Sequence, residues 1–180
     1  MRHVRSTLLW SSITELQARG HYDAYLANLP PSVAEVVSTT VAATWLPIEI
    51  GDAHFAACEA LDLPRDVAVE IGSSSCRRLQ QSLLNSFLFL ARGAADPLAL
   101  FPAYPRVWGR YFDGGGMVAY QVGPKEVHLE LKEIPFFRYR YCHHAIRGMT
   151  QALVTLFHEK ASVREVAATS TSVAVRVAWA

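Results

Sequence analysis

The chain has 180 residues, a formal net charge of +1, and 51% apolar against 18% charged residues. This length predicts a single domain, residues 1–180, and the apolar content excludes a disordered chain. The near-neutral charge gives no reason to expect a nucleic-acid partner. No apolar run reaches the roughly 18 residues that a transmembrane segment needs. The three cysteines are far apart and form no C-x-x-C pair, which favours reduced thiols and a cytoplasmic protein.

The first part of the chain, residues 1–113, is predicted to be helical. Capping residues, apolar spacing and Gly or Pro stops indicate helices at about 6–18, 22–29, 32–44 and 51–61, with a corner at 45–49. The longest helix is predicted over 64–91. Gly72 lies inside it and predicts either a break or a close contact with a neighbour. A further helix is predicted from Asp96 to Phe112, kinked or split by its prolines.

The last part, residues 114–180, has the period-2 alternation of strands around one helical stretch. Apolar residues alternate with others in three runs: Val118, Tyr120, Val122; Val127, Leu129, Leu131; and Val173, Val175, Val177, Trp179. Between the second and third runs, Cys142, Ile146, Met149, Leu153 and Leu156 recur at helical spacing. The predicted fold class is α+β, with a helical N-terminal half followed by a β-β-α-β-β unit that forms a four-stranded antiparallel sheet with one packed helix.

This order of elements resembles the fold shared by haem-nitric-oxide-binding sensor domains, 4-vinyl-reductase (V4R) domains and the small TRAPP vesicle-tethering subunits. Short motifs are more specifically similar to a myxobacterial paralogous family of unknown function. They are the WLPIE run at 45–49, Ile71-Gly72, the YPRVW run at 104–108, and the closing runs at 163–166 and 173–179. The resemblance covers nearly the whole chain.

The chain departs from the haem-binding members at the residues that hold the cofactor. Those members carry an axial His on a helix shortly before a Tyr-Pro-like element, but residues 96–103 contain no His. They also carry a Tyr-x-Ser-x-Arg motif for the propionates, whereas residues 129–133 contain neither Tyr nor Arg. We therefore expect no haem, and no other cofactor beyond an apolar ligand or acyl chain. V4R-like domains often carry cysteines in the final hairpin, and none lies there. TRAPP subunits hold an acyl chain on a Cys, for which Cys58 and Cys76 stay open as candidates.

No pattern in the sequence predicts catalysis or a metal. Cys142, His143 and His144 are adjacent on a predicted helix, where side chains turn about 100° apart, so they do not converge on one ion. The small-residue run at 71–76 lacks the second Gly of a nucleophile elbow, and no strand precedes it. We predict no catalytic residues and a protein that is not an enzyme.

One set of aromatic residues is denser than simple helix packing requires, and it predicts either core packing or a pocket between the helical half and the sheet. They are Trp108, Tyr111, Phe112, Phe136, Phe137 and Tyr139. A stripe of small residues, Tyr141, Ala145, Gly148 and Ala152, either leaves room for a ligand or admits a neighbouring helix. The predicted pocket residues are Cys76, Leu79, Leu83, Trp108, Phe112 and Met149, with Met149 at the floor.

The function that follows is a non-enzymatic binding or sensor domain that holds a small apolar ligand and signals to a protein partner. The alternative is a structural adaptor that acts through homodimerisation or another protein contact, as the TRAPP likeness implies.

Overall fold

The structure is a computed structural model that describes residues 1–40, 43–91, 98, 104–156 and 159–180, with the backbone alone for 80–91, 104, 106 and 107. The predicted helix from Asp96 therefore begins outside the described residues. Its last part forms α6 (Tyr104–Tyr111).

Four helices follow one another in the N-terminal part: α1 (Ser6–Ala18), α2 (Tyr22–Ala27), α3 (Pro31–Thr39) and α4 (Ile48–Ala60). The apolar spacing and the Gly or Pro stops located all four, but the N-cap positions Arg5, His21, Pro30 and Pro47 form no side-chain capping hydrogen bond. Pro31 occupies the first turn of α3, where its missing N–H costs nothing. Three boundaries differ from the prediction by two residues or more: α2 ends earlier, at Ala27, α3 ends earlier, at Thr39, and α4 begins earlier, at Ile48.

A small three-stranded sheet joins the two ends of the helical part, and the sequence did not predict it. Its strands are β1 (His3–Arg5), β2 (Trp45–Pro47) and β3 (Phe112–Asp113), in the order β2-β1-β3. His3 pairs with Pro47 on one side and with Asp113 on the other. Strands of two or three residues carry no periodic signal, so only these long-range pairings reveal them. The predicted corner at 45–49 is β2 and the first residues of α4.

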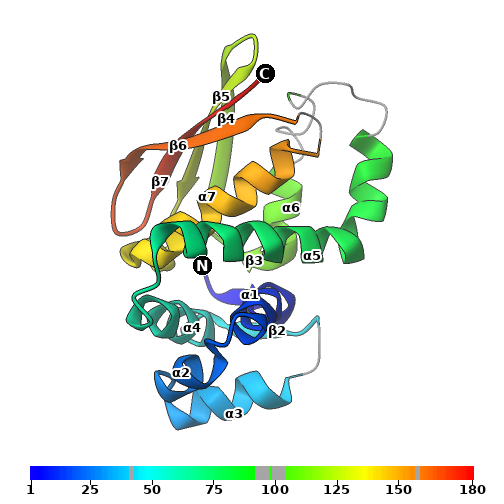
Figure 1. The fold of residues 1–180 in the computed structure, drawn as a ribbon. Helices are drawn as coiled ribbons and strands as arrows, with labels where there is room; N and C mark the ends of the chain where they lie inside the picture. The colour runs from blue at the N-terminus through cyan, green and yellow to red at the C-terminus, as the bar shows by residue number, and fades with distance from the viewer. Residues whose placement is uncertain (41–42, 92–97, 99–103, 157–158) are drawn as a thin grey trace.

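Two long helices, α5 (Arg65–Ala91) and α7 (Arg140–Val154), cross each other at their glycines (Figure 1). A Cβ on Gly72 would lie 2.1 Å from the carbonyl oxygen of Ala145, and a Cβ on Gly148 would lie 1.9 Å from that of Val69. The helix α5 runs through Gly72 without a break, so Gly72 marks a close contact. The small-residue stripe of α7 therefore admits a neighbouring helix at Ala145 and Gly148. A short 3₁₀ helix, η3 (Pro135–Arg138), leads into α7.

The main sheet has four antiparallel strands and confirms the predicted fold class. They are β4 (Gly116–Gly123), β5 (Glu126–Lys132), β6 (Ala161–Ala168) and β7 (Val173–Trp179), in the order β4-β5-β7-β6. On the inner face, Leu129 of β5 lies opposite Val175 of β7, and both are buried. The apolar runs at 127–131 and 173–179 therefore form the inner face, as their alternation indicates.

Strand β4 turns its apolar run to the outside. Val118, Tyr120 and Val122 are 48%, 42% and 45% exposed, whereas Met117 and Ala119 pack against the core. The register explains this orientation, because Tyr120 lies opposite His128 and Val118 opposite Glu130. Residues directly opposite each other share a face of the sheet, and that face of β5 is the polar one.

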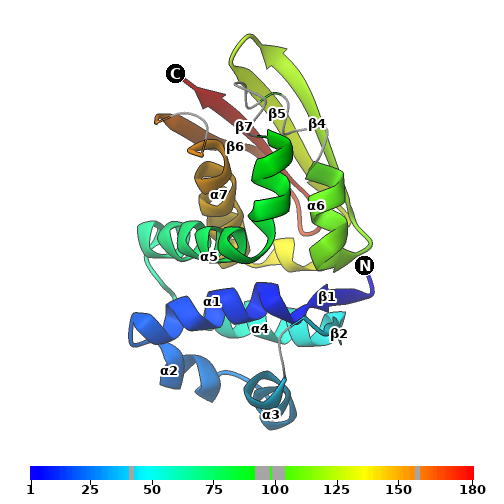
Figure 2. The ribbon, with the colours of Figure 1, turned by 90° about the vertical axis from the view of Figure 1, so that its right-hand side faces the viewer.

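The elements stack in layers that both ribbon views show (Figures 1 and 2). The four-stranded sheet forms one end, α1 to α4 form the other, and α5, α6 and α7 lie between them. The inner face of the sheet therefore packs on the middle helices. Within the described part of the chain, no helix is long and apolar enough to span a membrane.

Candidate functional site

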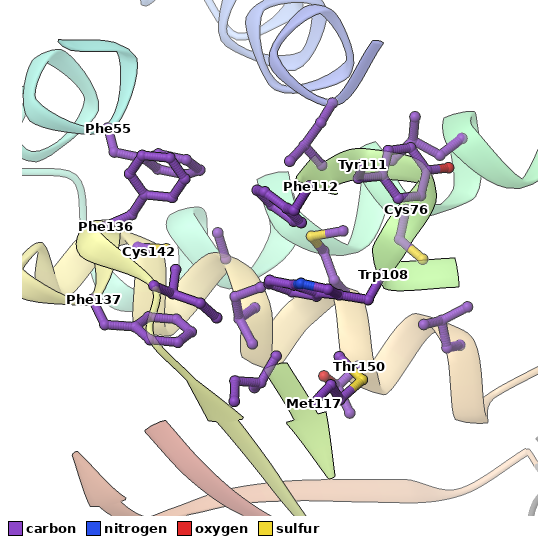
Figure 3. A pocket seen from close by; sticks show the side chains of 18 of the residues that line it. Phe55, Cys76, Trp108, Tyr111, Phe112, Met117, Phe136, Phe137, Cys142 and Thr150 are labelled. Carbon is purple, nitrogen blue, oxygen red and sulfur yellow. The ribbon is translucent and has the colours of Figure 1, made fainter. Parts of the chain in front are cut away.

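An apolar cavity of about 140 Å³ lies between the middle helices and the inner face of the sheet (Figure 3). Helices α5, α6 and α7 supply most of its wall, and β4 and β5 contribute Met117 and Leu131. The helical end of the molecule also reaches it, through Leu8 of α1 and Phe55 of α4. Side chains from these seven elements, together with Phe112 of β3 and with Phe136 and Phe137 of η3, thus converge on one space.

Five of the six predicted pocket residues line this cavity: Cys76, Leu79, Trp108, Phe112 and Met149. Leu83 lies on α5 where the structure describes the backbone alone, so its side chain falls outside the described part. The sequence did not single out Leu8, Phe55, Met117, Leu131 or Ile134 as cavity residues. Each is an ordinary apolar position of its own element, and only the tertiary packing brings it to the cavity.

Aromatic rings form one wall of the cavity. Trp108 stacks on Phe112 with ring centroids 4.1 Å apart, and Phe112 lies 6.3 Å from Phe136. Phe136 in turn lies 4.7 Å from Phe55, which extends the row into the helical end. The indole N–H of Trp108 donates to the carbonyl oxygen of Gly114 at 3.1 Å, so its polar edge is satisfied outside the cavity. The rings present apolar surface to the space they enclose.

Helix α7 forms the opposite wall with flexible and branched side chains. Ile146, Met149 and Leu153 lie on one face of the helix and line the cavity together with Cys142. Thr150, which is 4% exposed, adds a hydroxyl to a mainly apolar lining (Figure 3), in which Arg110 and Tyr111 of α6 are the other polar side chains. A methionine adapts its shape more readily than a branched residue, so this wall tolerates occupants of different outline.

Burial holds two ionisable groups at the cavity, Cys142 and Tyr111, in their neutral forms. Burial raises the pKa of the Cys142 thiol well above its usual range. Burial, with the nearby Cys76 as a second cause, raises the pKa of Tyr111 to about 12. A nucleophilic or metal-binding cysteine needs its thiolate, which this environment disfavours. The cavity can therefore hold an apolar molecule but offers no activated nucleophile at Cys142.

The Cys142, His143 and His144 run does not form a metal site. His143 contacts Glu165 through Nδ1 at 2.9 Å and the carbonyl oxygen of Phe137 through Nε2 at 2.6 Å. Cys142 points into the buried interior instead. Among the residues that the structure describes, no group of three or more His, Cys, Asp or Glu side chains is placed to hold a metal ion.

His54 is fully buried, which the sequence did not indicate. Its Nδ1 is hydrogen-bonded to the Tyr25 hydroxyl at 2.9 Å, and its Nε2 lies 3.7 Å from the Cys58 sulfur. Desolvation lowers the pKa of His54 to about 3, so the imidazole is neutral at physiological pH. Burial also raises the pKa values of Tyr25 and Cys58. The cluster is a neutral polar core between α2 and α4, separate from the cavity.

No protein-family model matches the chain, and no curated protein matches it in sequence. Solved structures of haem-NO-binding (H-NOX) domains do match its fold. A point mutant of the H-NOX protein from K. algicida, in the unliganded Fe(II) state, has a TM-score of 0.69 at 11% identity, covering 98% of this chain and 96% of that one. A point mutant of the T. tengcongensis H-NOX has a TM-score of 0.68 at 13% identity, covering 97% of each chain.

An oxygen-binding H-NOX domain related to soluble guanylate cyclases, in its oxygen complex, gives a TM-score of 0.65 at 14% identity and covers 97% of this chain and 94% of that one. At this level of identity, the similarity shows the fold. The chain therefore has an H-NOX-like fold over nearly its whole length.

The residues at the cavity do not fit a haem. A porphyrin is at least as large as a drug-sized ligand, whose pockets take roughly 300–1,000 Å³, whereas this cavity measures about 140 Å³. Its described lining contains no histidine, and the neutral thiol of Cys142 is a poor axial ligand. On β5, the inward positions are Val127, Leu129 and Leu131, which cannot bind a propionate, and Arg110 of α6 is the single cation that the described lining offers to two propionates.

Proposed function

We propose that this chain is a non-enzymatic sensor domain that binds a small apolar molecule in the cavity and passes the bound state to a protein partner. Its short motifs further suggest membership of the myxobacterial paralogous family of unknown function. The observation that carries the proposal is the cavity itself, a mainly apolar space where the helices α5, α6 and α7 meet the sheet. Close packing is the rule in protein interiors, so an apolar space of this size calls for an explanation.

The volume limits the ligand to a small molecule. An apolar cavity of about 150 Å³ stays dry and takes up benzene or xenon, and this one measures about 140 Å³. The expected ligand class is therefore a compact hydrocarbon-like molecule or the end of a short acyl chain. The Thr150 hydroxyl gives such a ligand one polar group to contact.

The experiment fills the cavity. The parent protein should show a rise in melting temperature with benzene, because a ligand that binds the folded state alone stabilises it. The variant Met149→Trp should fold but show no rise, since the indole occupies the space. The matched control Met149→Leu conserves volume and should keep the benzene response.

Two results would contradict this function. One is the absence of any benzene or xenon response in the parent protein. The other is a Met149→Trp variant that is destabilised by the roughly 1–3 kcal/mol of an overpacked core, because a filled interior has no place for the larger side chain.

The alternative function is an adaptor that acts through homodimerisation, and the outward apolar run of β4 favours it. Val118, Tyr120 and Val122 lie exposed on an edge strand, where unpaired backbone groups can pair with another chain. Sedimentation velocity tests this alternative. A dimer that Val118→Lys dissociates would support it, with Val166→Lys on the opposite edge strand as the control; a monomeric parent would exclude it.

A further inference from the structure

An open groove of about 510 Å³ lies along the two helices α5 and α7 and shares no lining residue with the cavity. Arg65, Ser73 and Arg77 of α5 line it at spacings of eight and four residues, which places them on one helix face. Arg147 and Gln151 of α7 are likewise four residues apart and face them. Three guanidinium groups from two helices thus border one groove.

These arginines lack the carboxylate partners that usually balance such a cluster. Within the described part of the chain, neither Arg65 nor Arg147 forms an ion pair, and Arg77 donates only to the Ser74 hydroxyl at 3.1 Å. The Nε of Arg147 is shielded from solvent and has no hydrogen-bond partner. Desolvation and then the like charge of Arg65 lower the pKa of Arg147. The groove therefore holds positive charge that the described residues do not neutralise.

Two of the three nearby carboxylates contact side chains other than the groove arginines. Glu70 lines the groove but is bound by Arg19, with 3.0 Å between Nη1 and Oε2. Glu165, whose charge reaches Arg147, contacts His143 at 2.9 Å. Asp66 lines the groove as well. The cations in the lining thus outnumber the carboxylates that remain to offset them.

The crossing holds this arrangement firmly. The Ser73 hydroxyl donates to the carbonyl oxygen of Gly148 at 3.0 Å, directly beside Arg147. The backbones touch at Gly72 and Gly148, so the two helices cannot slide without a clash. The guanidinium groups are therefore presented on a rigid pair of helices, which lowers the entropic cost of binding between them.

We propose that this groove binds the phosphate group of a small soluble ligand. Guanidinium forks match the oxygens of a phosphate in pairs, and charge-assisted hydrogen bonds of this kind are among the strongest that proteins make. A dianionic group placed there offsets the repulsion between Arg65 and Arg147 and accepts hydrogen bonds from the guanidinium groups that line the groove. The site is distinct from the apolar cavity, because the two have no lining residue in common.

The test is a titration of the full chain with inorganic phosphate at constant low ionic strength, followed by amide chemical shifts. We expect a saturable shift that centres on α5 and α7 around Ser73 and Gly148. Arg147→Gln should abolish it, and Arg65→Gln and Arg77→Gln should each weaken binding by at least about tenfold, since each loses a charge-assisted contact. Added sodium chloride should weaken binding as well.

Arg164→Gln is the matched control. Arg164 also faces an arginine, Arg176, but on the outer surface of the sheet, and it forms no ion pair among the described residues. It should leave phosphate binding unchanged. The proposal is overturned if the shift does not saturate, if sodium chloride alone reproduces it, or if Arg147→Gln and Arg164→Gln bind phosphate equally well.

Discussion

The two faces of α7 are packed differently: one is in close backbone contact with α5, and the other borders the cavity. Towards α5, Ala145, Gly148 and Ala152 have almost no side chain, and the backbones touch. Towards the sheet, Ile146, Met149 and Leu153 are long, yet they border an empty space of about 140 Å³. Side-chain size along a helix therefore does not by itself locate a cavity.

The comparison shows what decides the difference. Small side chains allow a neighbouring helix to approach until the two backbones are in contact. The neighbouring helix then fills the space that larger side chains would occupy, and no cavity remains on that face. On the sheet side, α7 is held by its contact with α5 and by the strands, and it cannot move to close the gap. The close-packed face fixes the position of the helix, and the cavity remains on the other face.

The largest effect should come from breaking the close-packed face. Gly148→Ala places a Cβ 1.9 Å from the Val69 carbonyl oxygen, where backbone would have to move. We expect a loss of more than about 3 kcal/mol in the free energy of unfolding, measured by urea denaturation.

Gly109→Ala is the matched control for that change. Gly109 lies in α6, and an added Cβ there meets no atom within 4 Å. Alanine favours the helix, so this variant should be neutral or stabilised by up to about 1 kcal/mol. Equal losses in both variants would mean that the α5 and α7 contact is not as close as described.

The second effect is a pH dependence of the free energy of unfolding, which arises from His54 near the N-terminal end of α7. Tyr141 of α7 contacts Ser12 at 3.3 Å and is hydrogen-bonded to Cys58, next to His54. The pKa of His54 is lowered from 6.5 to about 3 in the folded chain, so the unfolded state takes up the proton first as the pH falls. The contribution of His54 to the free energy of unfolding is fully present above pH 6.5. It is lost progressively as the pH falls towards 3, by about 1.4 kcal/mol per pH unit.

The measurement is urea unfolding at several pH values for the parent and for His54→Phe. The variant lacks the titrating ring, so the difference in free energy between the two proteins should change with pH in that window. An imidazole signal of His54 that titrates near pH 6.5 in the folded protein would show that the ring is solvated, contrary to this account.

The third effect, on the cavity face, should be small. Met149→Trp adds volume where Met149 borders empty space, so we expect a change of less than about 1 kcal/mol in the free energy of unfolding. Gly148 is the neighbouring residue on the same helix but lies on its other face. Comparing Met149→Trp with Gly148→Ala therefore tests the difference between the two faces of α7 most directly. Similar large losses at both positions would mean that the cavity face is as tightly packed as the other.

The smallest effect should come from Glu130→Ala on the outer face of the sheet, away from α7. Glu130 contacts Lys132 and Tyr120 at the surface, where ion pairs contribute little. We expect the melting temperature to change by less than about 2 °C in a thermal scan. A larger drop would mean that the outer face is packed against something, as the adaptor alternative requires.

The sequence by itself determined the elements with strong local periodicity. The alternation at 127–131 and 173–179 placed the inner face of the sheet, and the helical spacing of Ile146, Met149 and Leu153 placed the cavity face of α7. These patterns are readable because burial on one side of a regular element repeats with its period. Leu79 could be placed on the buried side of its helix for the same reason, whereas Trp108 and Phe112 were indicated by the density of aromatic residues and Cys76 by the likeness to TRAPP subunits.

Only the tertiary structure decided the features that depend on distant partners. The strands β1 to β3 exist through pairings between His3, Pro47 and Asp113, and the outward turn of β4 follows from its register with β5. Three further features arise where two elements meet. They are the burial of His54, the close backbone contacts of α5 and α7 at Gly72 and Gly148, and the proximity of Arg65 and Arg147. Periodicity reports which side of one element is buried; it does not report which neighbour covers that side, nor how closely.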